Sequence, residues 1–327
     1  MSTPAYQAGV AALSGHDWPA AVAHLTLAAS GPDASPEALE ALGKAYFWCD
    51  DPRAIQAREA AYRGYREHGD PRGAARVAFA LAYDHVTFLG EPAAAQGWLD
   101  LAERSLAPVP IGVEHGYLAA WQADFAYWAG DATGLATHAA QAVEIAAATG
   151  DSDLDLIGRA QLGLAQVLHG EVDAGMRLLD ATAVAAVAGE LRDPEFSGYV
   201  CCYLIGACSI ARDTERAAEW CRKLEAHCRR VGFHALQQVC RAEYAEVLVE
   251  AGEWRRAEAE ALSAADGLHE RRPGLESDAL VRLAELRRRQ GRRAEAAYLF
   301  ARSEGHPAAL RGLAALGLVE TLPRQGA

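Results

Sequence analysis

The chain has 327 residues, enough for two ordinary globular domains or for one elongated array, and 51% of them are hydrophobic, mainly Ala and Leu. This composition favours helices. The net charge of −13 argues against nonspecific affinity for nucleic-acid backbones and anionic membranes, because both need a positive protein surface. We therefore expect an all-α protein that binds neither nucleic acid directly nor a membrane.

A helix-breaking turn, usually Gly followed by an acid, recurs along the chain, and after the first interval its spacing stays near forty residues. Gly ends the first helix of a pair in the left-handed conformation, and the acid favours the positive dipole end at the start of the second helix. In chain order the turns are Gly15-His16-Asp17, Asp50-Asp51-Pro52, Gly90-Glu91-Pro92, Gly130-Asp131, Gly170-Glu171, Arg212-Asp213, Gly252-Glu253 and Gly291-Arg292. Each turn predicts the middle of one helix pair.

Prolines mark the junctions between the pairs, because proline disfavours continuation of the preceding helix. The turns and prolines together predict helix pairs over residues 4–30, 35–69, 71–107, 112–149, 152–189, 194–231, 233–270 and 274–304. A single closing helix is predicted near residues 307–318. We expect the whole chain, residues 1–327, to form one array of stacked helix pairs.

Small residues flank the turns at fixed distances, seven residues before and five residues after, where they let the paired helices approach closely. Gly163 and Gly175 stand at these positions around Gly170, as do Ala245 and Ala257 in a later repeat. This pattern resembles the tetratricopeptide repeat. The resemblance implies a right-handed α-solenoid of about eight tetratricopeptide-like helix pairs, with helices longer than in the common repeat of about thirty-four residues.

Repeats of this length that are rich in Ala and Arg are also similar to the arrays of large LuxR-type transcriptional regulators, in which the array senses a ligand or a partner. No phosphate-binding G-x-x-x-x-G-K-S/T motif precedes the array in this sequence, and no DNA-reading helix-turn-helix follows it. The resemblance therefore implies a sensing array without the NTPase and DNA-binding parts of those regulators.

In repeats of this kind the first helix of each pair lines the concave face of the array. The side chains six residues before each turn form a column with several acids: Lys44, Asp84, Asp124, Leu164, Ala207, Glu246 and Glu285. Aromatic side chains lie beside this column or deeper on the same helices: Phe47, Trp48, Phe88, Tyr117, Tyr127, Trp128 and Tyr203. Aromatic walls with a few carboxylates suit a cationic or amphipathic ligand, through cation–π attraction and charge-assisted hydrogen bonds.

The sequence therefore predicts a non-enzymatic binding, sensor or scaffold protein that recognises a peptide, a protein segment or a small effector in its concave groove. Such a protein needs no cofactor, and it could form a homo-oligomer. The predicted ligand-binding residues are Trp48, Asp84, Phe88, Tyr117, Asp124, Tyr127, Trp128, Tyr203 and Glu246.

Three other interpretations remain open. Aromatic residues at helical spacing, such as Trp121 and Trp128, can equally form inter-helix core, and the acids can form a solvated helix face. An enzyme built on the repeat could use Asp84 or Asp124 as a general acid or base in an aromatic pocket, as in a cyclase of specialised metabolism. A purely structural assembly protein would use its convex face or its arginine-rich run over residues 287–293.

The start of the chain lacks the basic and apolar segments of a secretory signal, which predicts a cytoplasmic protein. Six of the seven cysteines fall within residues 201–240, and in a reducing compartment we expect no disulfide framework among them. Cys201 and Cys208 on one helix could meet Cys221 and Cys228 on the next in a zinc or redox site. The short C-x₂-C spacing of structural zinc sites is absent, so we expect these cysteines to pack in the core and predict no metal.

Overall fold

The computed structural model describes residues 3–31, 34–303 and 306–318, and in these ranges it contains seventeen α-helices, one π-helical turn and no strand. The helices are α1 (Pro4–Ser14), α2 (Trp18–Ala28), α3 (Pro36–Trp48), α4 (Arg53–Glu67), α5 (Pro71–Asp84), the π-helical turn η1 (His85–Leu89), α6 (Pro92–Leu106), α7 (Val113–Ala129), α8 (Ala132–Thr149), α9 (Ser152–Leu168), α10 (Val172–Ala188), α11 (Pro194–Ala211), α12 (Thr214–Val231), α13 (His234–Glu250), α14 (Trp254–His269), α15 (Pro273–Arg289), α16 (Arg293–Arg302) and α17 (Pro307–Ala315). None of these helices has an apolar stretch long enough to cross a bilayer.

The eight predicted helix pairs are confirmed, from α1–α2 to α15–α16, and α17 is the predicted closing helix. At each turn inside a pair one residue has a positive φ, as a left-handed helix end requires: His16, Asp50, Gly90, Gly130, Gly170, Arg212, Gly252 and Gly291. The acid that follows the turn caps the second helix in several pairs. The Asp131 carboxylate, for example, accepts a hydrogen bond from the backbone N–H of Gly134 at 2.8 Å.

The paired helices approach closely at the small positions, as predicted. A Cβ added to Gly175 would overlap the carbonyl oxygen of Gly163 on the partner helix, so neither position has room for a larger residue. The equivalent alanines are almost fully buried, including Ala123, Ala217, Ala257, Ala284 and Ala296. Small residues therefore set the spacing within each pair.

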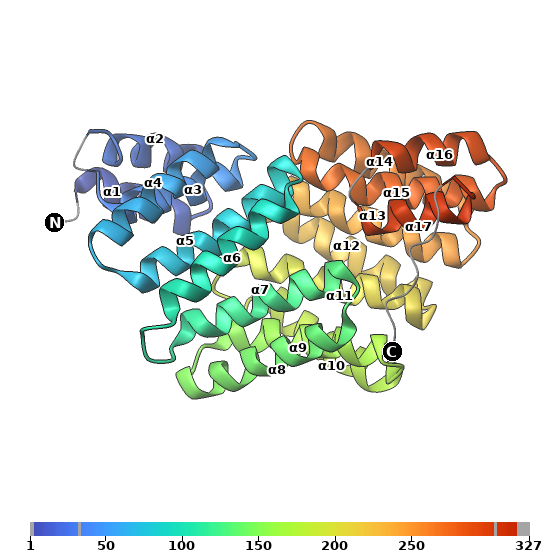
Figure 1. Cartoon of the computed structure of the whole chain (residues 1–327), viewed down its shortest axis with the longest axis horizontal. Coiled ribbons are helices and arrows are strands. Elements are labelled where there is room, and N and C mark those ends of the chain that lie inside the picture. Colours follow the sequence, from blue (N-terminus) through green and yellow to red (C-terminus); the bar gives the residue numbers. More distant parts are fainter. Residues whose placement is uncertain (1–2, 32–33, 304–305, 319–327) are drawn as a thin grey trace.

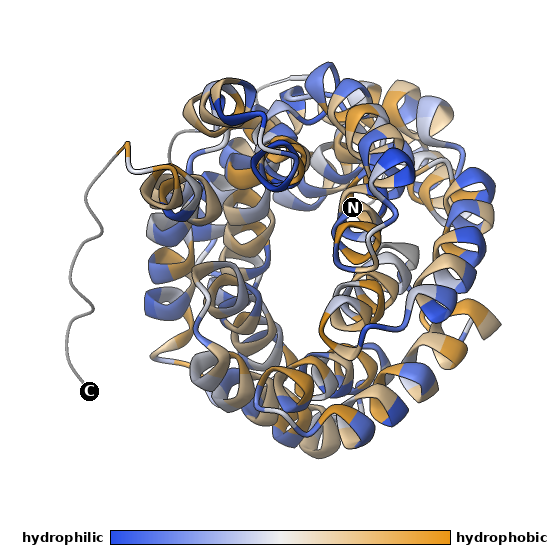
Figure 2. Ribbon diagram, turned by 90° about the vertical axis from the view of Figure 1, so that its right-hand side faces the viewer, coloured by the Kyte–Doolittle hydropathy of each residue, from blue (hydrophilic) through white to orange (hydrophobic). Residues whose placement is uncertain are grey.

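The pairs stack into a right-handed solenoid in which the first, odd-numbered helices contact one another. Helix α11 contacts α9 and α13, and α13 also contacts α15 (Figure 1). At right angles to this view the pairs wind into a ring of helices (Figure 2). We call the first helices of the pairs the inner helices.

The superhelix completes a turn and packs on itself, which the sequence did not predict. The indole Nε1 of Trp18 donates a hydrogen bond to the carbonyl oxygen of Val231 at 2.7 Å, across 213 residues of sequence. Trp48 stacks on Trp18 at 4.4 Å between ring centroids, and Phe233 lies 4.6 Å from Trp48. The turn η1 likewise contacts α15 (Figure 1). The first three repeats therefore pack against repeats six to eight.

The structure contains one disulfide, whereas the sequence predicted none among these cysteines. Cys202 of α11 and Cys240 of α13 are joined, with their Cα atoms 5.6 Å apart. The thiols of Cys201, Cys208 and Cys228 are buried, and burial raises the pKa of each to about 12. These three are therefore neutral packing residues, as expected. Over the described ranges, no three His, Cys, Asp or Glu side chains gather where they could hold a metal ion.

Candidate functional site

An aromatic surface joins three inner helices that lie far apart in the sequence. The ring of Tyr83 on α5 lies 5.1 Å from that of Trp121 on α7 and 5.7 Å from that of Tyr199 on α11. Phe196 extends this surface along α11 and stacks on Tyr117 of α7 at 5.7 Å. All of these rings except Tyr83 remain partly exposed, so the surface can still contact a ligand.

A buried polar cluster connects α7, α9 and α11. The Asp124 carboxylate, 7% exposed, accepts hydrogen bonds from the Tyr203 hydroxyl at 2.5 Å and from Gln161 Nε2 at 2.9 Å. Gln161 Nε2 also donates to the carbonyl oxygen of Ala120 at 2.9 Å. Burial raises the pKa of Asp124 to about 6, although the two hydrogen bonds oppose this shift. Asp124 is thus held rigidly, and its charge changes just below neutral pH.

A second polar cluster lies where α7, α13 and α15 meet. Arg282 of α15 pairs with Glu243 of α13, and its Nε lies 3.2 Å from a carboxylate oxygen of Glu246. Asp278 lies 3.9 Å from the same guanidinium group, so three carboxylates surround one cation. Burial, and then the charge of Glu243, raise the pKa of the Tyr127 phenol beside them. Burial raises the pKa of Glu243, against the charge of Arg282, and three carboxyl groups face a single cation in this cluster.

Two predicted site residues on the inner helices, Trp128 and Glu246, keep accessible side chains. The Glu246 side chain is 46% exposed, and Trp128 of α7 is 40% exposed while its ring packs against Phe125 at 5.1 Å. A ligand on the inner helices can reach both side chains without a rearrangement of the core.

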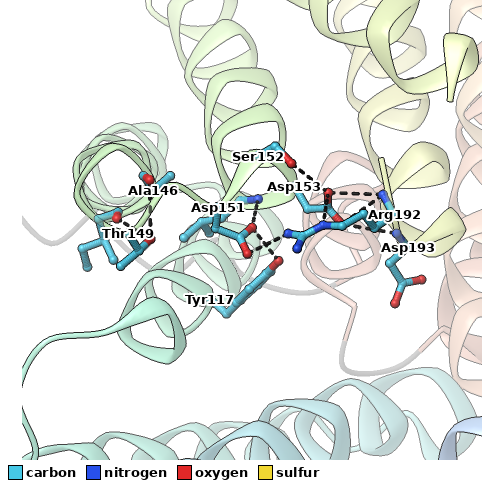
Figure 3. Close-up of polar contacts among 10 residues, drawn as sticks. Tyr117, Ala146, Thr149, Asp151, Ser152, Asp153, Arg192 and Asp193 are labelled. Carbon is cyan, nitrogen blue, oxygen red and sulfur yellow. Dashed lines mark hydrogen bonds and ion pairs between the residues drawn. The ribbon is translucent and has the colours of Figure 1, made fainter. Parts of the chain in front are cut away.

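Tyr117 contributes its ring to the aromatic surface, but its hydroxyl has a partner within the protein. It donates a hydrogen bond to Asp151 Oδ1 at 3.1 Å (Figure 3). Asp151 also caps α9 and pairs with Arg192 at 2.7 Å, and Arg192 contacts Asp153 at 3.2 Å. The hydroxyl of Tyr117 therefore helps to fix the loop before α11 on the start of α9.

The structure corrects the expected placement of Trp48, Asp84 and Phe88, because none of them faces an open groove. Trp48 is 3% exposed and packs between Trp18 and Phe233. Asp84 is fully buried, and Phe88 is 4% exposed. All three lie at the C-terminal ends of the first helices of repeats two and three, where the superhelix packs on itself. Closure therefore converts this part of the predicted groove into an intramolecular interface.

The sequence contains a signal for the inner site that the column of acids did not reveal. Five successive repeats have a large side chain nine residues before the turn residue with positive φ. These side chains are Trp121, Gln161, Tyr203, Glu243 and Arg282. All five belong to the aromatic surface or to the two polar clusters. The predicted residues Asp124 and Glu246 lie about one turn after Trp121 and Glu243 on the same helices, and Tyr127 lies three residues after Asp124, beside Glu243. The predicted residue Trp128 lies seven residues after Trp121, on the same face of α7. We call these nine residues the inner site.

Comparisons with known proteins bear on the fold. No protein-family model matches the chain, and no curated protein sequence matches it. Among solved structures, the chain is similar to a Rap protein complexed with competence and sporulation factor, at 11% identity over 90% of this chain and 78% of that one, with a TM-score of 0.60. It is similar to a human IFIT1 dimer with m7Gppp-AAAA at 15% identity over 95% and 71%, with a TM-score of 0.53. The observed helix pairs and this structural likeness show that the fold is an array of tetratricopeptide-like helix pairs.

Proposed function

We propose that the protein is a binding module that holds a peptide, a protein segment or a small effector at the inner site. One observation carries the proposal. In a solenoid, equivalent positions of successive repeats have the same packing role, so packing alone would select similar small or aliphatic residues there. The column from Trp121 to Arg282 instead holds five chemically different side chains. The buried Gln161 and Tyr203 fix Asp124, while the partly exposed Trp121 and Glu246 beside the column offer an aromatic face and a carboxylate to a ligand.

The chemistry of the inner site favours a cationic or amphipathic ligand. Glu243, Glu246 and Asp278 surround the single cation Arg282, and Asp124 adds a fourth carboxyl group. The aromatic surface between α5, α7 and α11 offers ring faces to an apolar or positively charged group. Charge-assisted hydrogen bonds to the carboxylates would then orient the ligand.

The two similar structures support a binding role for this fold but not a particular ligand. One was solved with competence and sporulation factor and the other with m7Gppp-AAAA, so the fold accepts ligands of different chemistry. A nucleic-acid ligand is compatible with the fold, whereas the net charge of −13 and the acids of the inner site favour a cation in this chain. The likeness to the LuxR-type arrays stays a prediction.

An enzymatic role for Asp124 has less support. Its raised pKa would suit a general acid or base, but such chemistry also needs a pocket that holds a substrate beside the carboxyl group. Asp124 is 7% exposed, and its carboxyl group is already bonded to Tyr203 and Gln161 within the protein. We therefore favour binding over catalysis.

Native mass spectrometry of the protein as isolated tests the proposal. We expect a co-purifying mass with the wild type and its loss from the double variant Trp128→Ala, Glu246→Gln, which changes only accessible side chains. Trp254→Ala is the matched control, because Trp254 is equally exposed at 40% but starts an outer helix. A ligand retained by the double variant, or lost from the control as well, would count against the inner site. The same spectra report whether the protein forms a homo-oligomer.

A further inference from the structure

Arg272, just before α15, lies in a site that is built like a receptor for its side chain. It is 1% exposed, and its guanidinium carbon lies 4.2 Å from the ring centroid of Phe47 and 4.0 Å from that of Phe88. Its Nε donates to Asp50 Oδ1 at 2.8 Å, and its two terminal nitrogens donate to the carbonyl oxygen of Phe47 at 2.5 Å and to Thr87 Oγ1 at 3.2 Å. Two mutually perpendicular rings therefore flank the guanidinium group, and each of its three nitrogens has a hydrogen-bond partner.

The charge around this site favours a cation. Asp50, whose side chain is 8% exposed, is the direct partner of Arg272. The fully buried Asp84 lies behind the site and pairs with Arg58 at 2.5 Å. The site residues come from repeats two and three, whereas Arg272 comes from the junction of repeats seven and eight. The receptor and its occupant are thus separated by about two hundred residues, 222 in the case of Asp50.

Three departures from regular repeat geometry meet at this contact. Asp50 has a φ of 55°, although most equivalent turn positions carry glycine. The π-helical turn η1 replaces the end of α5 and supplies Thr87 and Phe88. A Cβ added to Gly274, two residues after Arg272, would overlap the carbonyl oxygen of Val86. Such strained or unusual backbone persists where the surroundings enforce it, often at ligand clamps and switches.

We propose that repeats two and three form a guanidinium-binding site, that Arg272 fills this site within the same chain, and that an arginine of a peptide or protein segment takes its place when the superhelix opens. The site is separate from the inner site. An incoming guanidinium group would make the same stacking contacts and hydrogen bonds as Arg272. The competition is therefore decided by the effective concentration of the tethered Arg272, and Arg272 acts as an internal inhibitor.

The variant Arg272→Ala empties the site and allows a direct test. We expect its Tm to fall by roughly 5–10 °C, since a buried, paired cation is lost. Millimolar ethylguanidinium and the capped tripeptide Gly-Arg-Gly should then restore part of this loss in a saturable manner, whereas ethylammonium, which lacks a planar face and a fork of donors, should not.

Arg271→Ala is the matched control. Arg271 also contacts Asp50, at 3.3 Å, but its side chain is half exposed and its removal leaves Arg272 in place, so neither probe should raise the Tm of this variant. Equal responses of the two variants, or an equal response to ethylammonium, would contradict the site. A response to ethylguanidinium but not to the tripeptide would overturn its assignment to peptide arginine.

Refolding provides a second measurement if Arg272→Ala does not fold alone. Recovery of folded protein with ethylguanidinium, but not with ethylammonium, supports the proposal, and recovery with neither contradicts it. Because these measurements involve no residue of the inner site, their failure would leave the proposed function untouched.

Discussion

Replacing Asp84 by alanine should lower the free energy of unfolding by about 3–5 kcal/mol, the usual cost of breaking a buried ion pair. Asp84 is fully buried, and a carboxylate oxygen lies 2.5 Å from the guanidinium group of Arg58. Arg58 is itself only 6% exposed. The guanidinium of Arg272 is also close enough to lower the pKa of Asp84, against the larger raising effect of burial. Without the carboxylate, the buried guanidinium group of Arg58 would lose its counter-charge, whereas Arg272 would keep Asp50.

Urea unfolding at neutral pH measures this loss. Asp155→Ala serves as the control, because Asp155 pairs with Arg159 one turn away on the surface of α9 and its side chain is 32% exposed. Exposed pairs of this kind contribute about 0.2–1 kcal/mol. Similar losses in the two variants would show that Asp84 is not the counter-charge of a buried pair.

The free energy of unfolding should also depend on pH through Asp124. Its pKa is raised by burial from 3.8 to about 6 in the folded protein, so between these values the folded state binds more protons than the unfolded chain. This group therefore stabilises the fold fully below pH 4, and its contribution is lost as the pH rises through 6. The loss amounts to at most about 3 kcal/mol.

Asp124→Asn should remove this contribution, because the amide oxygen can still accept the hydrogen bond from Tyr203 and does not titrate. Urea unfolding of both proteins at pH 4, 5, 6 and 7 provides the comparison. The difference between the two curves is the informative quantity, since Asp51 and Asp151 have lowered pKa values and change stability in the opposite direction. Parallel curves for the two proteins would show that Asp124 titrates normally.

The helix pairs could be predicted because their signals are local. A left-handed residue ends the first helix, an acid caps the second and small residues set their spacing, so each repeat is specified within about forty residues of sequence. Asp50 and Arg212 stand where most turns have glycine, and both adopt the positive φ that glycine adopts there. The pattern therefore predicted these two turns correctly.

The closure of the superhelix could not be predicted, because it depends on small rotations that accumulate over several repeats. A weak signal exists in the acid at position 50, where most equivalent turns carry glycine, and the structure gives it a partner in Arg272. The disulfide has a similar signal. Cys202 and Cys240 are 38 residues apart, close to one repeat, which places them side by side on adjacent inner helices.

The inner site could be predicted only in part. Asp124, Tyr127, Tyr203 and Glu246 come together on the inner helices, but the predicted column lay six residues before each turn, and of the column nine residues before the turn only Tyr203 was predicted. That column mixes aromatic, amide and charged side chains, so it has no single chemical signature. In the arginine-rich run, Arg287, Arg288 and Arg289 each pair with a glutamate.

Small-angle X-ray scattering tests the closed superhelix most directly. Closure is central because it buries Trp48, Asp84 and Phe88, fills the proposed guanidinium site and leaves the inner helices of the middle repeats as the proposed binding surface. The scattering of the wild type should match the closed solenoid, and Arg272→Ala should show a larger radius of gyration. A wild-type profile that fits only an extended, open solenoid would contradict the account.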